Sequence, residues 1–553
     1  MLDCHWMKQL RELAYDIEDS IDKLLIKSGC RFKQESYGSN LLQEFKNRIV
    51  DLQYLGKQFG RLKVGFADLV PSDVTLDLED TTPEKIMHVD EIPCGEKPCV
   101  VGFGGPESEI VPRLIDDEKE LKVVSVLGPG GLGKTTLARE VFKKQRSQFD
   151  CGAIVYVGRY PSIDDTRMDV ARQVMPNSLV PCDKKVITKK LREFLYTKRY
   201  LIVIDDIWTI SSWNSITCAF PENNLGSRIL ATTEAEKLAK FCCVKPIDFI
   251  FVLKPLADCD SRLLLLSRMS FSEEDCQNYR NILKSALKVC GGNPLAVVVT
   301  AGLLATKAGQ PWVLENTILS MTKQDYGPQE VTKILDMSYS DLPLHLKSCF
   351  LYLSTFPENC TILKDRLIRR WIAEGFIPLR KGESLWSVGK SYFKELARRG
   401  LIQLVLNDIN DEIGCTIHNI IHEFIRSLSM EENFVTVGEH LSSISYPCDT
   451  VRRFTHDCSK QYESGVLSSM TVQLSKVRSL AVSGNTNKQL SDVSTFKLVR
   501  VLDLEGAMGL RKRQLRSIRS LVLLRYLSLR GTDAYQPPRE MKALQHLETV
   551  DLR

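Results

Sequence analysis

The segment 121–138, LKVVSVLGPGGLGKTTLA, constrains the fold of this chain more than any other stretch. Its apolar start predicts a buried strand, its glycines a turn, and the residues from Lys134 a helix. In that context the spacing G-x-x-x-x-G-K-T is that of a phosphate-binding loop. The glycines that let backbone N–H groups point at phosphate oxygens are Gly128, Gly130, Gly131 and Gly133. Lys134 is expected to reach the β- and γ-phosphates and Thr135 to bind Mg²⁺, so we predict a nucleoside phosphate site.

A second landmark is the segment 201–208, LIVIDDIW. Its four apolar residues predict a central strand of a parallel α/β sheet, and Asp205 and Asp206 follow where such sheets bind ligands. Mg²⁺ on a bound nucleotide would offset the cost of these two carboxylates. We expect Asp205 to be its ligand and Asp206 to orient or deprotonate water. An acidic turn without function is the alternative, and the upstream phosphate-binding loop argues against it.

Composition excludes several classes of protein. With 74 basic and 69 acidic residues, the net charge of +5 does not indicate a nucleic-acid partner. No signal peptide and no apolar run of ~18 to 20 residues is present, which predicts an intracellular protein. The 17 cysteines form no C-x-x-C pair, as is typical of a reducing compartment. His418 and His422 stand four apart on a helical pattern and could hold a metal, but no third ligand is evident.

The regions on either side of the nucleotide site have their own patterns. Apolar spacing predicts amphipathic helices over 10–25 and 41–62, and 68–98 reads as a polar linker. The first helix has an acidic face, which is either solvated or paired with a partner; its residues include Glu18, Asp19 and Asp22. In the tail the pattern L-x-x-L-x-L recurs with central positions Leu480, Leu502, Leu527 and Val550, which predicts leucine-rich repeats.

The order of these features resembles that of plant coiled-coil NLR proteins, intracellular immune receptors of the NB-ARC type. Besides 128–136 and 201–208, the matching segments are 18–22 (EDVID-like), 226–233 (RNBS-B strand), 291–296 (GLPL-like), 349–357 (winged-helix signature) and 417–419 (in place of Met-His-Asp). The expected fold is multidomain α/β. Its parts are a partial coiled-coil helical domain (1–67), a linker (68–98), a P-loop nucleotide-binding domain (99–253), a small helical domain (254–328), a winged-helix domain (329–430) and incomplete leucine-rich repeats (431–553).

The resemblance implies an ADP/ATP-gated switch. ADP would lie between the P-loop, helical and winged-helix domains and lock an inactive monomer. On pathogen perception ATP would replace ADP, and the opened receptor would oligomerise and trigger defence and cell death. The implied nucleotide-binding residues are Val101, Gly102, Gly128, Gly130, Gly131, Leu132, Gly133, Lys134, Thr135, Thr136, Arg228, Thr233, Pro294 and His418. Val101 and Gly102 would contact adenine, Pro294 would pack on the base, and His418 would reach the β-phosphate.

The resemblance also implies partners. Glu18, Asp19 and Asp22 would pair with basic residues of the repeats. A pathogen effector or a guarded host protein would be recognised, with self-oligomerisation on activation and no nucleic acid partner. The expected location is the cytoplasm, with transient association with the plasma membrane. Any ATP hydrolysis would be slow and would reset the switch.

Three departures from the family pattern bear on function. Glu234 stands where the family typically has an Arg facing the γ-phosphate, and a carboxylate there is expected to repel phosphate. Asn419 replaces the Asp of Met-His-Asp and is expected to weaken the closed state by ~1 to 2 kcal/mol. Both ends of the chain look truncated against the family. The truncations support one alternative, a non-signalling protein that modulates a full-length partner. A second alternative is an active P-loop ATPase, against which Glu234 and the repeat tail argue.

Overall fold

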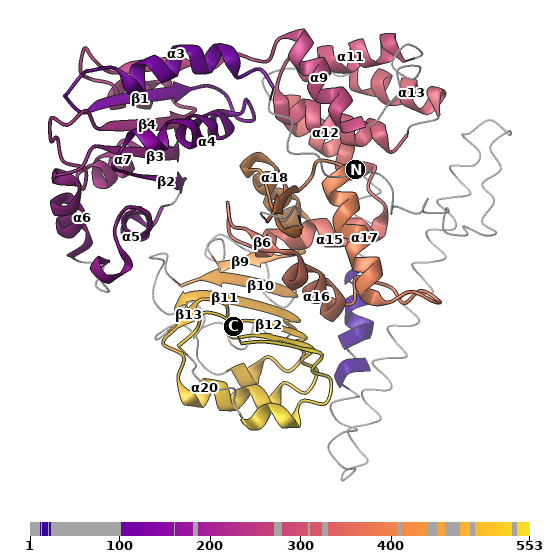
Figure 1. Cartoon of the computed structure of the whole chain (residues 1–553). Coiled ribbons are helices and arrows are strands. Elements are labelled where there is room, and N and C mark those ends of the chain that lie inside the picture. Colours follow the sequence, from indigo (N-terminus) through magenta and orange to yellow (C-terminus); the bar gives the residue numbers. More distant parts are fainter. Residues whose placement is uncertain are drawn as a thin grey trace, which may run out of the picture.

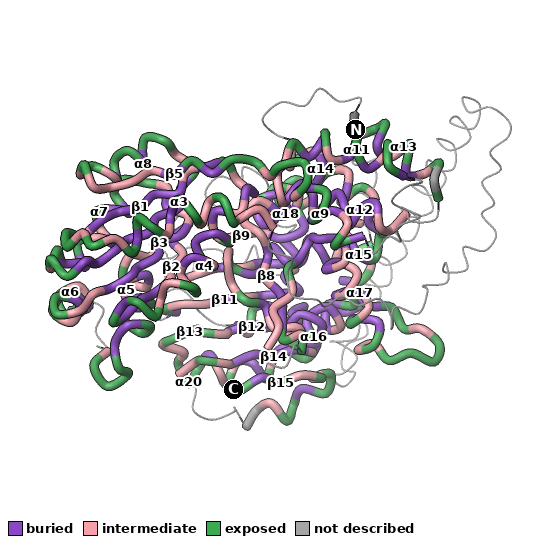
Figure 2. The backbone as a smooth tube through the Cα atoms, turned by 45° about the horizontal axis from the view of Figure 1, so that its top comes forward, coloured by how far each residue is buried: buried purple, intermediate pink, exposed green. Residues whose placement is uncertain are grey.

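The computed structural model describes residues 11–12, 14–19, 21–23, 101–159, 161–180, 186–269, 279–307, 310–322, 330–407, 411–438, 451–458, 476–486, 493–533 and 539–552. The predicted helix over 41–62 and the linker 68–98 lie outside these residues. A parallel sheet with its helices, a helical cluster, a central winged-helix region and a repeat region follow one another along the chain (Figure 1). Buried segments run through the middle of each region (Figure 2).

The first region is a five-stranded parallel sheet in the order β2-β3-β4-β1-β5. Its strands are β1 (Lys122–Leu127), β2 (Cys151–Gly158), β3 (Tyr200–Ile207), β4 (Arg228–Thr233) and β5 (Phe249–Val252). Its helices are α3 (Gly104–Ile115), α4 (Lys134–Gln145), α5 (Ile163–Val174), α6 (Ile187–Tyr196), α7 (Ile210–Thr217) and α8 (Glu236–Cys242). This arrangement confirms the predicted α/β class.

The run LIVI of β3 is apolar throughout because both faces of the sheet are covered. Leu201 and Val203 belong to the core beneath α3 and α4, whereas Ile202 and Ile204 belong to the core beneath α5, α6 and α7. Successive side chains of a strand point to opposite faces, so each core receives every second residue. The strand ends, which carry Asp205 and Asp206, are therefore held rigidly at one edge of the sheet.

The second region contains helices α9 (Asp258–Met269), α11 (Arg280–Cys290), α12 (Pro294–Ala305) and α13 (Pro311–Thr322). Helix α12 is apolar nearly all round because it contacts α9 on one side and α14 of the next region on the other. Gly302 of α12 lies so close to the winged-helix region that a Cβ there would be 2.4 Å from the Arg399 carbonyl oxygen. A side chain at this position would push the two regions apart.

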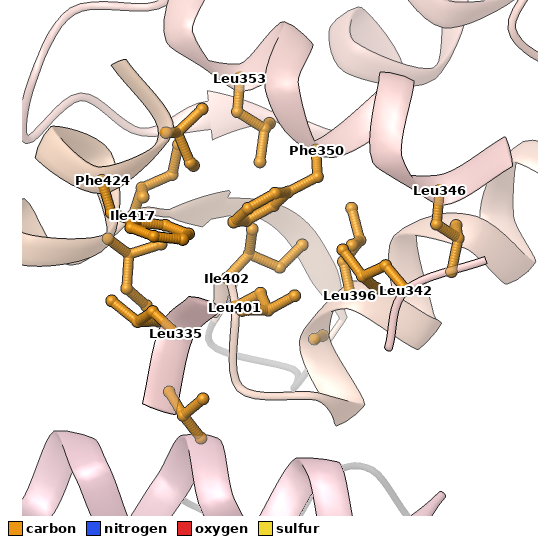
Figure 3. Close-up of a cluster of buried hydrophobic side chains, with 14 of the residues drawn as sticks. Leu335, Leu342, Leu346, Phe350, Leu353, Leu396, Leu401, Ile402, Ile417 and Phe424 are labelled. Atoms are coloured by element: carbon orange, nitrogen blue, oxygen red, sulfur yellow. The ribbon is translucent and has the colours of Figure 1, made fainter. Parts of the chain in front are cut away.

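The third region is a winged helix. Its elements are α14 (Glu330–Ser340), α15 (Leu344–Leu351), β6 (Ile362–Leu363), α16 (Lys364–Glu374), α17 (Leu385–Arg398), β7 (Gln403–Leu406), β8 (Glu412–Thr416) and α18 (Asn419–Glu431), with an antiparallel sheet in the order β6-β8-β7. Leu335, Phe350, Leu396 and Phe424 come from different helices and converge on one core (Figure 3). The same core continues into α9, α11 and α12, so the two regions share one hydrophobic interior.

The repeat region forms a parallel sheet in the order β15-β14-β12-β11-β10-β9, with β13 beside β11. Its strands are β9 (Thr436–Val437), β10 (Arg453–Asp457), β11 (Ser479–Asn485), β12 (Val501–Asp503), β13 (Ala507–Met508), β14 (Tyr526–Ser528) and β15 (Thr549–Asp551). The predicted central positions are direct neighbours in the ladder, since Leu480 pairs with Leu502, Leu502 with Leu527 and Leu527 with Val550. The repeat prediction is thus confirmed, whereas β9 and β10 were not predicted.

Buried ion pairs dock the repeats against the winged helix. Asp503 of β12 accepts hydrogen bonds from Arg366 at 2.7 Å and Arg370 at 3.0 Å, both on α16. Burial alone would raise the pKa of Asp503, but the two guanidinium groups hold it below its ordinary value. Separately, none of the helices in the described part of the chain is long and apolar enough to cross a membrane.

Candidate functional site

A cavity of about 640 Å³ lies between the carboxyl edge of the parallel sheet and the start of α18. The phosphate-binding loop, both acidic residues of β3 and the winged helix all contribute to its wall. Lining residues include Gly131, Gly133, Lys134, Thr135, Thr136, Asp205, Asp206, Glu234, His418, Asn419 and Ile420. The structure therefore brings together most of the residues that the sequence assigned to phosphate and metal binding.

The phosphate-binding loop needs glycine at two positions of the turn before α4. Gly131 has φ +78° and Gly133 has φ +93°, a backbone conformation that other residues adopt at a cost. A Cβ at Gly131 would also lie 2.8 Å from Asn293 Oδ1, and the Asn293 amide donates to Gly130 O at 3.0 Å. Asn293 is the N-cap of α12, so the helical region fixes the shape of the loop.

Asp205 has the surroundings of a cation ligand. Its carboxylate is 2% exposed and accepts hydrogen bonds from Thr135 Oγ1 at 3.0 Å and from Thr232 Oγ1 at 2.6 Å. Burial raises its pKa above the ordinary value for Asp, because these hydroxyls only partly replace water. A divalent cation bound to phosphate would stabilise the charged form, so Thr135 and Asp205 fit the predicted Mg²⁺.

Asp206 is engaged across the interface between the sheet and the winged helix. Its backbone has φ +59°, and its N–H donates to Thr232 Oγ1 at 2.8 Å. Its Oδ2 accepts from Tyr156 Oη at 2.9 Å and from Asn419 Nδ2 at 3.1 Å. The carboxylate expected to orient water thus also connects the nucleotide sheet to α18.

His418 is the N-cap of α18, and its Nδ1 accepts the backbone N–H of Ile420 at 3.2 Å. The neutral ring therefore carries its proton on Nε2, which makes Nε2 a donor suited to a phosphate oxygen. Burial and the nearby charge of Lys134 lower the pKa of His418 to about 4. His422 is turned elsewhere and lies 2.9 Å from Phe356 O through Nε2, so the two rings have different partners.

Acidification is expected to loosen the contact of α18 with the phosphate-binding loop. A solvated His has a pKa near 6.5, and the packed His418 one near 4. The neutral ring contributes stability that is complete above pH 6.5 and is lost as the pH falls toward 4, by about 3 kcal/mol in total. The measurement is denaturant unfolding of the nucleotide-free chain between pH 4 and 7. His418→Asn keeps a capping acceptor that does not titrate, so the free energy of unfolding should depend less on pH in this variant. An equal dependence on pH in both proteins would contradict the role of His418.

The residues expected around adenine lie apart from this cavity wall but close to one another. A Cβ at Gly102 would be 2.5 Å from the Leu256 side chain, and Leu256 N donates to Gly292 O at 2.8 Å. Pro294 follows two residues later as the first residue of α12. Val101 packs against the core shared by the helical and winged-helix regions. The adenine contacts remain a prediction.

Two residues implied by the resemblance are turned away from the cavity. Arg228 begins β4, whereas the site lies at the end of this strand, ~16 Å away at about 3.3 Å per residue. Its buried guanidinium donates to Asp116 Oδ1 at 2.7 Å and to Glu118 O at 2.7 Å. The Thr233 hydroxyl donates to Ile207 O at 2.8 Å, within the sheet. Both assignments to the nucleotide site are wrong for these side chains, and Thr232 faces Asp205 instead.

The acidic helix near the N-terminus packs on a column of arginines from the repeats. Asp19 bonds Arg452 and Arg478, and Asp22 accepts from Arg500 at 2.6 Å. Further members of the contact are Asp16 with Arg452 and Lys476, Glu18 with Arg478, and the Tyr15 ring, 4.8 Å from the Arg478 guanidinium. These contacts match those implied by the resemblance and exclude a purely solvated face.

Sequence reasoning missed several residues that complete these sites. Tyr156 gave no signal, and Asn293 lies in the matched segment 291–296 but was not assigned a role, because each acts through a partner remote in sequence. The column of arginines did leave a signal in the sequence, since Val-Arg recurs at 451–452, 477–478 and 499–500, directly before β10, β11 and β12. That repeat identifies the arginines as a row on the sheet.

Three family descriptions match consecutive parts of the chain. They are the NB-ARC domain at residues 106–276, the disease resistance protein winged helix domain at 355–425 and a leucine-rich repeat region at 476–553. Among solved structures, a STAND ATPase from Pyrococcus horikoshii matches 58% of this chain and 42% of its own at 15% identity, with a TM-score of 0.37, too low for comparing site geometry.

Curated relatives match along almost the whole chain. Disease resistance protein RGA5 of Oryza sativa subsp. japonica is 31% identical over 99% of this chain and 51% of its own length. Pik-2 of the same species is 29% identical, with 61% of its length covered. The ToMV susceptible protein tm-2 of Solanum lycopersicum is 27% identical, with 64% covered. This chain thus spans between about half and two-thirds of these relatives.

Proposed function

Because this chain belongs to the NB-ARC disease resistance proteins, we propose that it is a plant immune receptor that acts as an ADP/ATP-gated switch. In the proposed resting state ADP and Mg²⁺ bind between the phosphate-binding loop and α18. Exchange for ATP releases the winged helix and leads to oligomerisation and defence signalling. Hydrolysis, if the chain performs it, is slow and restores the resting state.

The cavity shared by the two domains is the observation that carries the proposal. Lys134 and Thr135 come from the sheet domain, whereas His418 and Asn419 come from the winged helix. A diphosphate bound to the loop would accept a hydrogen bond from the Nε2–H of His418, so the ligand itself would join the two domains. A ligand that contacts both domains stabilises the arrangement in which both contacts exist.

The buried contact between the N-terminal helix and the repeats supports a closed resting state. Arg453 donates to Glu374 of α16 at 3.0 Å and to Tyr15 Oη at 3.1 Å, and so links the helix, the repeats and the winged helix. We propose that release of this contact exposes the helix for assembly with further copies. The same proposal includes recognition of an effector or guarded host protein. It also includes a cytoplasmic location with transient contact with the plasma membrane.

The experiment that tests this function is identification of the nucleotide that copurifies with the chain. Purified protein is denatured, and the released nucleotide is separated by chromatography and quantified per chain. We expect ADP at close to one per chain and a loss of at least about tenfold in Lys134→Ala, because the loop lysine supplies the charge that binds phosphate. Lys144→Ala is the matched control, since Lys144 lies on the same helix but pairs with Glu107 at 2.6 Å.

The other outcomes favour the alternatives. A wild-type chain that purifies without nucleotide would contradict the switch and favour a protein that acts only by binding a partner. Steady release of many phosphates per chain per minute would favour an active ATPase. Equal ADP content in wild type and Lys134→Ala would mean that the nucleotide is held elsewhere.

A further inference from the structure

Glu234 occupies a place in the phosphate site that strand pairing fixes. It follows the last residue of β4, and in the parallel pairing of β4 with β1, Thr233 lies opposite Leu127. Gly128 N donates to Thr233 O at 3.3 Å, which extends the pairing into the first turn of the phosphate-binding loop. The register therefore places residue 234 beside this loop whatever its side chain is.

The Glu234 side chain lies among three parts of the site. Its Oε1 is 3.4 Å from Lys134 Nζ, and it is 2.8 Å from where a Cβ would stand on Gly130. Ile420 Cδ1 of α18 is 2.7 Å from the same Gly130 position. The Glu234 side chain is 34% exposed, whereas that of Lys134 is 8% exposed. The carboxylate is thus next to the buried ammonium group, with α18 packed on the same loop glycine.

A group at this distance from the lysine stands where a phosphate oxygen of the ligand would be. The lysine of a phosphate-binding loop reaches the β- and γ-phosphates, and the β-phosphate lies in the cradle of backbone N–H groups at the helix start. The γ-phosphate of a triphosphate would extend beyond this cradle, into the cavity that the ends of β3 and β4 line. Asp205 is the expected cation ligand there, and Glu234 and Asp206 line the same cavity, so a third phosphate would meet carboxylates that the cation does not neutralise.

We propose that Glu234 is a specificity determinant that makes this closed site select a nucleoside diphosphate over a triphosphate. The inference rests on the nucleotide binding proposed above and adds the reason for selection. ADP, whose last phosphate lies in the cradle of the loop, would leave the Glu234–Lys134 pair in place. ATP requires the carboxylate to move, and Ile420 of α18 restricts the space around Gly130 through which it would move. Entry of the third phosphate is therefore coupled to displacement of the winged helix.

The test compares affinities for ADP and for the non-hydrolysable ATP analogue AMP-PNP. The full chain is stripped of nucleotide, and both ligands are titrated with Mg²⁺ by calorimetry. Wild type should bind AMP-PNP at least about tenfold more weakly than ADP, because like charges placed together disfavour binding. Glu234→Gln keeps the shape without the charge and should bind AMP-PNP about tenfold more tightly than wild type, with ADP affinity changed by less than about threefold.

Glu236→Gln is the matched control. Glu236 lies two residues further on, at the exposed start of α8, and pairs with Lys240 at 2.6 Å outside the cavity. The control should keep the wild-type ratio of the two affinities, and thermal melts should verify that both variants are folded. If both proteins bind ADP and the ratio of ADP affinity to AMP-PNP affinity is the same in wild type and Glu234→Gln, the selectivity role is overturned while nucleotide binding stands. If wild type binds neither ligand, the proposed function fails as well.

Discussion

Replacing Asp19 with alanine should detach the N-terminal helix from the repeats. Asp19 is 2% exposed and bonds Arg452 and Arg478, which are 1% and 2% exposed. Removing the carboxylate leaves two guanidinium groups buried beside each other without their shared partner. Breaking a buried pair in this way costs about 3 kcal/mol or more, which is a factor of about a hundred in the equilibrium for detachment.

Hydrogen exchange measured by mass spectrometry on the full chain reports this detachment directly. Backbone amides of the helical residues 14–19 and 21–23 should exchange about a hundredfold faster in Asp19→Ala, while those of β1 and β3 remain protected. Glu18→Gln is the matched control on the same helix. Glu18 also pairs with Arg478, but its side chain is 50% exposed, so its removal should change exchange by less than about fivefold. Unchanged protection in Asp19→Ala would show that apolar packing alone holds the helix.

Replacing Asn419 with aspartate should speed ADP release at least about tenfold. The Asn419 amide donates to the Asp206 carboxylate at 3.1 Å, and this bond joins α18 to the end of β3. A carboxylate at position 419 cannot donate and would face a second carboxylate. A hydrogen bond to a charged group contributes about 1.5 to 3 kcal/mol, and like-charge repulsion adds to its loss. Release of a fluorescent ADP derivative, chased with unlabelled ADP, measures the rate.

Two further variants separate charge from simple loss of contact. Asn419→Ala removes the donor without adding a charge and should speed release less than Asn419→Asp does. The double variant Asn419→Asp with Asp206→Asn reverses donor and acceptor and should recover part of the slow release, as expected for a direct pair. A release rate in Asn419→Asp equal to that of wild type would contradict the role of this bond. The geometry reverses the expectation from the resemblance, in which an Asn here weakens the closed state.

Much of the fold was predictable because its signals are local. Each predicted segment carries its own apolar pattern, so it could be identified without knowing its neighbours in space. These segments are the strand before Gly128, the run 201–204 and the repeats around Leu502. The α/β class and the repeat register followed from these segments. Strands β9 and β10 were not predicted, because their alternation is short and only the adjacent β11 makes them part of a sheet.

In the candidate site, too, some residues could be predicted from local sequence and others could not. Lys134, Thr135 and Asp205 were identified from residue type and spacing, and they meet as predicted. Arg228 was assigned wrongly because a motif shows only that a residue is near a strand, whereas the direction of the strand decides which end reaches the cavity. The roles of Tyr156 and Asn293 were not predicted, although Asn293 lies in the matched segment 291–296, because each role depends on the remote atom that the side chain bonds.

The sequence by itself determined which segments form the phosphate-binding loop, the central strand of the sheet and the repeats, since backbone preference and apolar spacing act over a few residues. Only the tertiary structure decided what joins those segments. Asp206 meets Asn419, 213 positions later, and Asp19 meets Arg478, 459 positions later. Such pairings depend on strand register and domain packing, which no local spacing encodes. The proposed control of this protein lies in those contacts, because they are the ones that opening of the domains would break.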